Sequence, residues 1–354
     1  MRHVGHASGN ELEGFARWRR LASNSLLACR HLVESWEGTA LRKIISWVLL
    51  GLGAFMLAAA VVATVWAPDQ AKRAPLDTDS TTHLSGTAQK LNTGTGEVDD
   101  LDVRAVSITQ ADSNKSDDDV VVYVNTSCLV IDIPDTPDCG EPGTGDDADP
   151  NVINISNELF ATDRRTGVAV NGDKYLPEGT PEREGLQNKF PFDAEKKDYE
   201  FWDGILDSTV PATYEGTEEI DGLETYRYNM SVVEEEATVI GDVDGIYSLD
   251  KTMWIEPNTG SIVDQEQHDV RTLPNGDPLL DLQLSFTDEQ VSANVDDASA
   301  NVSSLTLITK TVPLVGFIGG AICIIAGILL LVSGRRKNKS EPAHVQKSKA
   351  PAAT

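Results

Sequence analysis

Two long uncharged segments divide the chain. The first covers residues 44–67, and the second covers residues 312–333. At about 1.5 Å per residue, the first reaches about 36 Å as a helix, enough to cross the roughly 30 Å hydrocarbon core of a bilayer. We therefore predict two transmembrane helices at these positions and one large domain, residues 68–311, between them.

Between the two uncharged segments the pattern is that of β-strands. β-Branched, partly alternating stretches predict strands, and turn residues such as Asp221-Gly222 predict hairpins. The predicted strands and hairpins are 101–108, 120–133, 158–170, 213–232, 251–267 and 278–286. At least six strands, each close to its neighbour in sequence, predict an antiparallel sheet. Tyr226, Tyr228, Met230 and Val232 are expected on one buried face. The polar stretch 74–96 is interpreted as an exit loop or a short hairpin, and 135–151 as a surface loop.

The period of the apolar positions changes after the last predicted strand. Thr287 and Gln290 have the spacing of a helix capping box, and apolar residues follow at intervals of three and four up to Leu305. Pro313 is the expected joint to the second membrane helix. The predicted class is thus an α+β membrane protein. Two transmembrane helices flank a mainly antiparallel β ectodomain, for which a half-barrel is one form, and this domain ends in an amphipathic helix.

Basic residues stand on the outer flank of each membrane segment. Residues 1–43 contain seven Lys/Arg and four Asp/Glu, and residues 334–354 contain six and one. Positively charged flanks stay on the cytoplasmic side of a membrane. We therefore predict a plasma-membrane protein with two spans, cytoplasmic basic tails at 1–43 and 334–354, and the domain at 68–311 outside.

The beginning of the chain leaves alternatives open. The first apolar segment could be a cleaved signal peptide, but its 24 residues are long for a signal core, and Pro68 is unfavourable next to a cleavage site. The Arg- and Trp-rich residues 1–40 could form an interfacial helix, or the natural start could lie near Leu41.

The middle of the chain is strongly acidic. The formal charge of the whole chain is −27, and between the two basic tails there are 51 Asp/Glu against 16 Lys/Arg. Such a surface repels phosphate backbones, so nucleic acid is not an expected partner. Solubility in an ion-rich exterior and a dedicated role in binding cations both remain open.

Two of the four cysteines are placed to pair. Cys128 and Cys139 lie in the predicted ectodomain with ten residues between them, whereas Cys29 lies in the N-terminal tail and Cys323 in an apolar segment. In an exported domain, a Cys128–Cys139 disulfide is expected, stabilising by about 2–3 kcal/mol for so short a loop.

Catalytic and metal-binding motifs are missing from the sequence. The ectodomain contains only two histidines, His83 and His268, and no HExxH, GxSxG or P-loop. Asp147, Asp149, Asn151 and Glu158 have calcium-loop spacing, but Val152 stands where the loop needs glycine. We predict no enzyme activity, no catalytic residues, no cofactor and no metal site.

An aromatic cluster is the candidate binding site. It comprises Phe190, Phe192, Tyr199, Phe201 and Trp202. Such residues could line a pocket for an apolar ligand, or they could simply pack in the core.

Three stretches carry a family resemblance. They are residues 41–62 leading into 74–82, the block 187–203 with its Phe190-Pro191-Phe192-Asp193 and Trp202-Asp203, and 214–228 followed by the helix and second anchor. Together they resemble an actinobacterial envelope family labelled porin PorA, over roughly residues 41–335. The resemblance implies the two-anchor topology. The hairpins 216–228 and 253–267 are also similar, more weakly, to those of LolA- and LppX-type lipid carriers, which hold acyl chains in a curved half-barrel.

The functional prediction follows from topology and resemblance. We predict a membrane-anchored envelope protein that binds or transfers a lipid or another apolar envelope component. The alternatives are a scaffold that binds another envelope protein and an oligomeric channel.

Overall fold

The computed structural model describes residues 40–92, 94–134, 136, 139 and 151–337. It contains two compact units, one formed by the membrane segments up to Ala67 and from Thr309 onwards, the other by Pro68–Ile308. The predicted tails at 1–43 and 334–354 lie almost entirely outside the described residues. Their location therefore stays a prediction.

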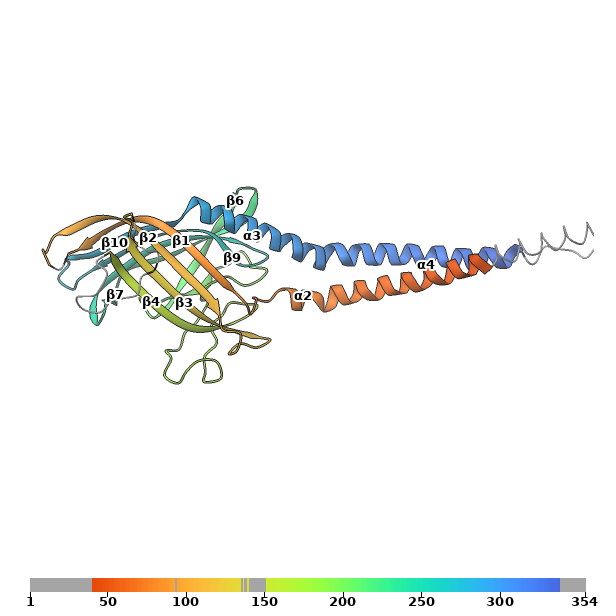
Figure 1. The fold of residues 1–354 in the computed structure, drawn as a ribbon, viewed down its shortest axis with the longest axis horizontal. Helices are drawn as coiled ribbons and strands as arrows, with labels where there is room; N and C mark the ends of the chain where they lie inside the picture. The colour runs from red at the N-terminus through yellow and green to blue at the C-terminus, as the bar shows by residue number, and fades with distance from the viewer. Residues whose placement is uncertain (1–39, 93, 135, 137–138, 140–150, 338–354) are drawn as a thin grey trace, which may run out of the picture. The chain divides into compact units, whose positions relative to one another are not determined.

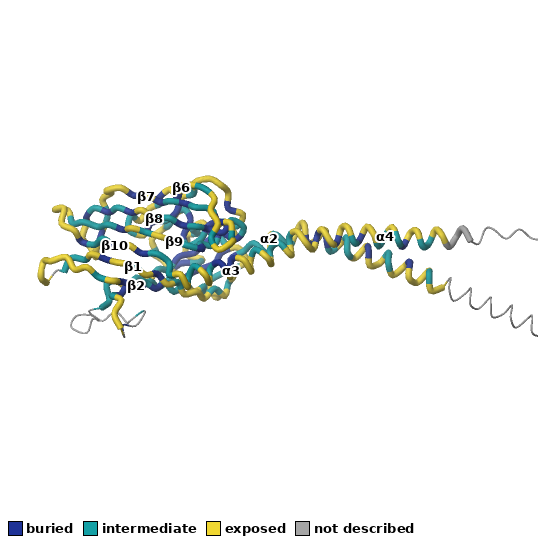
Figure 2. The backbone as a smooth tube through the Cα atoms, turned by 90° about the horizontal axis from the view of Figure 1, so that it is seen from above, coloured by how far each residue is buried: buried dark blue, intermediate teal, exposed yellow. Residues whose placement is uncertain are grey.

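The membrane unit is a pair of antiparallel helices. The helices long and apolar enough to cross a membrane are Ala40–Val65 and the run Asp288–Ser333, whose apolar part is α4 (Val312–Lys337). Glycines bring the two backbones together, since a Cβ at Gly53 would lie 2.8 Å from the carbonyl oxygen of Gly320. Small residues allow this approach. Most other positions on the two helices are exposed, as lipid-facing surfaces would be (Figure 2).

The second unit, predicted to be the ectodomain, is built on one ten-stranded antiparallel sheet (Figure 1). The short helix α2 (Ala67–Ala71) precedes it. In chain order the strands are β1 (Asp79–Leu91), β2 (Val98–Ala111), β3 (Val120–Ile131), β4 (Val152–Asp163), β5 (Tyr199–Asp203), β6 (Ser208–Ile220), β7 (Leu223–Ile240), β8 (Val243–Glu256), β9 (Ser261–Thr272) and β10 (Pro278–Phe286).

The sheet is a meander whose first and last strands meet. Its order is β4-β3-β2-β1-β10-β9-β8-β7-β6-β5. Every neighbour in this order is also a neighbour in sequence, except that β1 pairs with β10 through the register Leu84↔Phe286. The sheet curves into a half-barrel, which confirms the predicted fold class.

The strand predictions differ from the structure in three places. Residues 79–91 form a full strand, so the predicted exit loop is wrong there. The alternative, a short hairpin, placed a strand in this region but made it too short. The segment holds few apolar residues, but its Thr residues favour strands, and its inner face borders a cavity at Ser80 and Thr82 and packs in a core only at Leu84 and Ala88. Strand β5 was not predicted at all. In the hairpin predicted at 158–170, the turn is correct, but its second arm contributes only isolated bridges.

Those isolated bridges span the open side of the half-barrel. Thr162 of β4 bridges Ala169, Val168 bridges Leu186, and Leu186 bridges Phe201 of β5. The amide of Trp202 also donates to the carbonyl of Leu186 at 2.8 Å. The segment between β4 and β5 therefore connects the two edge strands and covers part of each edge against pairing with another chain.

The main core lies inside the half of the barrel formed by β5–β8. Tyr228, Met230 and Val232 are buried there, and Tyr226 packs beside them, so the expected buried face of this hairpin is confirmed. Figure 2 shows buried positions alternating with more exposed ones along these strands, as the two faces of a strand require.

Helix α3 (Asp288–Thr306) lies where β10 stops short. Beyond Phe286 no β10 residue pairs with the early part of β1 or with the first residues of β9. There the Gln290 side chain accepts from the amide of His83 in β1 at 3.0 Å, and Asn294 donates to the carbonyl of Val263 in β9 at 2.9 Å. The helix thus fills a gap between two strands (Figure 1).

The ends of α3 partly match their prediction. Thr287 caps the helix by accepting from the amide of Gln290 at 3.1 Å. The return bond of a capping box is absent, because the Gln290 side chain turns to β1 instead. At the other end a π-helical turn, Leu307–Thr311, leads into α4. This irregularity precedes Pro313, which lacks the amide hydrogen of a regular α-helical turn.

The predicted disulfide is confirmed. Cys128 of β3 is joined to Cys139, with a Cα–Cα distance of 5.5 Å. On the same face of the sheet, Val106 pairs with Cys128 and is 2% exposed. The disulfide therefore holds the chain after β3 against an apolar position of the outer face.

Candidate functional site

Three of the five predicted aromatic residues pack together in the main core. Phe190 is fully buried, with its ring centroid 5.6 Å from those of Tyr199 and Phe201 and 4.6 Å from that of Tyr228. The hydroxyl of Tyr228 donates to the carbonyl of Glu195 at 2.7 Å. Tilted and edge-on ring pairs of this kind are typical of dense core packing.

Trp202 lies on the other face of β5. Side chains alternate along a strand, so Trp202 points away from Phe201. The guanidinium of Arg183 lies 5.7 Å from the Trp202 ring and 5.3 Å from the Phe160 ring, and it pairs with Glu158 at 3.0 Å. Through Arg183, Trp202 thus packs against the face of β4 that carries Phe160, and it helps to fix the segment after β4.

Phe192 alone of the five borders a cavity. This cavity has a volume of about 570 Å³. It exists because β10 ends early, which leaves α3 as the wall between β1 and β9. Its lining comes from Ala71, Arg73, Ala74, Pro75, Thr78, Ser80, Thr82, Thr109, Tyr123, Asn188, Lys189, Phe192, Thr259, Ser261, Ile262, Phe286, Asn294, Asn301, Ser304, Leu305 and Ile308.

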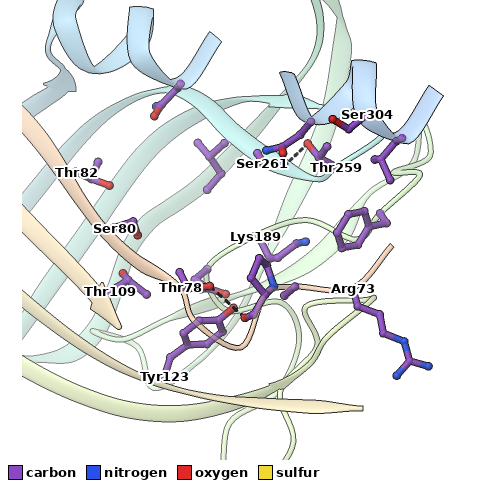
Figure 3. A pocket seen from close by; sticks show the side chains of 18 of the residues that line it. Arg73, Thr78, Ser80, Thr82, Thr109, Tyr123, Lys189, Thr259, Ser261 and Ser304 are labelled. Atoms are coloured by element: carbon purple, nitrogen blue, oxygen red, sulfur yellow. Dashed lines mark hydrogen bonds between the residues drawn. The ribbon is translucent and has the colours of Figure 1, made fainter. Parts of the chain in front are cut away.

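The cavity wall combines hydroxyl and amide groups with apolar side chains. Ser80 and Thr82 of β1 and Thr78 just before it turn inward, and Ser304 approaches from α3 (Figure 3). Apolar surface comes from Phe192, Ile262, Phe286, Leu305 and Ile308. Among the described lining residues there is no aspartate or glutamate, although the domain as a whole is strongly acidic.

Lys189 is the cation that extends into this cavity (Figure 3). Its ammonium lies 3.7 Å from the centroid of the Phe192 ring. Burial lowers the pKa of Lys189 to about 7, because the apolar surroundings disfavour the charged form. The other cation of the lining, Arg73, is bound to residues that do not line the cavity. It pairs with Asp119 at 3.3 Å and donates to the carbonyl of Asp69 at 3.0 Å.

A tight turn between β8 and β9 holds Lys189 and Phe192 in place. The amide of Phe190 donates to the carbonyl of Gly260 at 2.9 Å, and the amide of Ala194 donates to that of Pro257 at 2.7 Å. Gly260 has φ +72°, and a Cβ there would lie 2.6 Å from the carbonyl oxygen of Pro191 and closer still to that of Phe190. Only glycine allows this approach.

Glu256 stabilises the same turn from within. Its carboxylate is 1% exposed and accepts from the amides of Asn258 at 2.9 Å and Thr259 at 2.8 Å, and also from both their side chains. A buried carboxylate is tolerated when its oxygens are fully hydrogen-bonded. The turn is therefore a rigid support for the cavity loop.

Sequence reasoning missed Lys189 and the hydroxyl-lined wall. The signal was present in Thr78, Ser80 and Thr82, because small polar residues at alternate positions of a strand indicate an inner face that is not packed. Chain position alone does not tell that Lys189, next to a buried phenylalanine, reaches into a cavity.

Metal binding finds no support in the described part of the chain. No group of three or more His, Cys, Asp or Glu side chains is placed there to hold an ion. Asp147 and Asp149, which have the spacing of a calcium loop in the sequence, lie outside the described residues.

Comparison with known proteins identifies a family. No curated protein sequence matches the chain. The family model described as Porin PorA matches residues 45–329, which include both apolar helices and the whole half-barrel. The chain therefore belongs to the porin PorA family.

Proposed function

We propose that this integral membrane protein of the cell envelope uses its half-barrel to bind, and to pass on, a lipid or another apolar envelope component. The observation that carries the proposal is the cavity of about 570 Å³ behind α3. This volume lies within the roughly 300–1,000 Å³ of known small-ligand sites. The mixed lining suits an amphiphile, with hydroxyl and amide groups for a polar head and apolar side chains for part of a tail.

The cavity lies close to both membrane segments along the chain. Ala71 follows the end of the first membrane helix, Val65, by six residues, and Ile308 precedes the start of α4, Val312, by four. Such short connections favour a ligand that is taken from the membrane or delivered to it. Of the five predicted aromatic residues, we propose Phe192 as the ligand contact, with Phe190, Tyr199, Phe201 and Trp202 supporting the wall.

The orientation in the membrane is part of the proposal. Arg42 donates to the carbonyl of Leu330 at 3.1 Å and also to the hydroxyl of Ser333, so the basic flanks of the two helices lie at the same end of the pair. By the positive-inside rule this end is cytoplasmic. The ectodomain then faces outward from the plasma membrane.

The family name favours a second candidate, an oligomeric channel. It points to a non-enzymatic channel or structural protein, and we propose no catalysis for this chain. However, a single pair of helices packed through Gly53 and Gly320 encloses no pore. The outward-facing residues of β1, such as Thr81, Ser85 and Thr87, are polar, unlike the apolar outer band of a membrane barrel. A channel would thus need several chains, so a stable monomer would count against it.

The test uses the full chain, purified in a mild neutral detergent from a host that makes a comparable envelope. Native mass spectrometry and analysis of the extracted lipids should reveal a stoichiometric ligand. Thr82→Trp, which fills the cavity from β1, should abolish it. Thr81→Trp, on the opposite face of the same strand, is the matched control and should retain it. A folded protein that stays empty when envelope lipids are offered, or equal occupancy in both variants, would refute the proposal.

A further inference from the structure

We propose that the ligand of this cavity is anionic and that its head carries an oxyanion group, such as a phosphate, sulfate or carboxylate, that pairs with Lys189. This inference rests on the proposed function, since it specifies the chemistry of the amphiphile. It is carried by the isolation of the Lys189 ammonium in a cavity that offers many neutral hydrogen-bond donors.

No described group neutralises Lys189. Its ammonium forms no ion pair or hydrogen bond with the described residues. It makes a cation–π contact with the Phe192 ring, whose centroid lies 3.7 Å away. Lys189 is half-buried, and a charge withdrawn from water without a partner is costly, so such groups are normally paired. A ligand anion would supply the missing partner.

The groups that face Lys189 from each surrounding element are neutral or cationic. Strands β1, β2 and β9 contribute hydroxyls to the lining, and α3 contributes amide, hydroxyl and apolar groups. Tyr123 comes from β3, and burial raises the pKa of its hydroxyl, so it stays neutral. Arg73 is paired with Asp119. Burial is the cause of the lowered pKa of Lys189, with no contribution from a charged neighbour.

The remaining lining fits the rest of such a ligand. The hydroxyls of Ser80 and Thr82 can donate to the other oxygens of the oxyanion, and hydrogen bonds to a charged group are stronger than neutral ones. Leu305 and Ile308, at the end of the helical wall, offer apolar contact for the adjoining chain. Lys189 thus provides a positive charge for an anionic ligand that the acidic domain would otherwise repel.

Binding an anion must also change the protonation of Lys189. Without ligand its pKa is about 7, so the charged fraction falls about tenfold between pH 6 and pH 8. The anion stabilises the charged form and raises this pKa. Affinity should therefore be highest below pH 7 and weaken about tenfold by pH 8, with proton uptake on binding.

The experiment is calorimetric titration of the full chain in a neutral maltoside detergent. The probes are hexyl sulfate, whose charge is constant between pH 6 and 8, 1-hexanol as its neutral counterpart, and inorganic sulfate. Titration in two buffers of different ionisation enthalpy reports proton uptake. The variants are Lys189→Met, Lys189→Arg and the control Lys251→Met. Lys251 is also a buried lysine with a lowered pKa, but it does not line the cavity.

At pH 6 the wild type and Lys251→Met should bind hexyl sulfate at least about tenfold more tightly than hexanol. Their affinity for hexyl sulfate should be about tenfold lower at pH 8 than at pH 6. Lys189→Met should lose the preference for the anion. Lys189→Arg should keep the preference but lose the pH dependence, because arginine stays charged.

The other outcomes separate the two proposals. Equal binding of hexyl sulfate and hexanol by the wild type, or an undiminished preference in Lys189→Met, overturns the anion inference and leaves amphiphile binding standing. If inorganic sulfate binds as tightly as hexyl sulfate, the anion site is supported, but its ligand is a free anion. The proposal that the cavity binds an amphiphile is then refuted. If no probe binds, both proposals fail.

Discussion

The contact between Gly260 and the cavity loop allows a quantitative test. In Gly260→Ala the new Cβ must occupy a left-handed backbone position, which costs about 1–2 kcal/mol. It would also lie within 2.6 Å of the carbonyl oxygen of Pro191, so the loop must move. The movement breaks the bond from the Phe190 amide, about 1 kcal/mol. It also shifts a fully buried phenylalanine whose complete loss would cost about 3–5 kcal/mol. The total destabilisation should be at least about 3 kcal/mol.

Gly276→Ala is the matched control for this prediction. Gly276 has φ +86°, but no atom lies within 4 Å of the position of its Cβ. This variant should therefore show only the backbone cost of about 1–2 kcal/mol. Thermal unfolding in detergent measures both, at about 2–4 °C per kcal/mol for a domain of this size. Similar melting temperatures for the two variants would refute the idea that the close approach of the loop holds the cavity together.

Three further predictions concern other parts of the ectodomain. Cys128→Ser, which breaks the bond to Cys139, should lower the free energy of unfolding by about 2–3 kcal/mol, and a reducing agent should affect only the wild type. Tyr247→Phe removes the hydroxyl that donates to the buried Asp203 carboxylate at 3.0 Å, and chemical denaturation should reveal a loss of about 1.5–3 kcal/mol. The pKa of Lys189 is lower in the folded protein than in the unfolded chain, so the unfolded state binds more protons above pH 7. Relative to Lys189→Met, the wild type should then gain stability from pH 7 upward, at about 1.4 kcal/mol per pH unit once the pH exceeds about 8, and parallel pH profiles would contradict this.

The fold was predictable wherever one face of an element is continuously buried. The buried β7 positions Tyr228, Met230 and Val232 alternate with more exposed residues. This two-residue alternation, together with the turn residues Asp221-Gly222, was enough to predict the hairpin. Strand β1 escaped prediction because only Leu84 and Ala88 of its inner residues are buried apolar residues, whereas Ser80 and Thr82 border the cavity. Strand β5 has only five residues, too few for a reliable period. The pairing of β1 with β10 was not predictable, because local sequence does not encode contacts between the two ends of a domain.

The aromatic cluster shows the limits of site prediction from one sequence. Phe190, Phe192, Tyr199, Phe201 and Trp202 are close in sequence, but the structure distributes them over the main core, a cavity and the opposite face of β5. The alternation along β5 separates Phe201 from Trp202, and the loop geometry at Gly260 separates Phe190 from Phe192. Both depend on backbone conformation, which composition does not reveal.

The pairing of β1 with β10 also sets the order in which the ectodomain can fold. Strands β1–β4 and β5–β10 each pair with sequence neighbours, so both meanders can form as soon as they are synthesised. Leu84 cannot meet Phe286 until nearly all of the domain has left the ribosome. Contacts this distant in sequence slow folding. We therefore expect a late step in which the two preformed halves join along a single seam, just before α3 and the second membrane helix complete the chain.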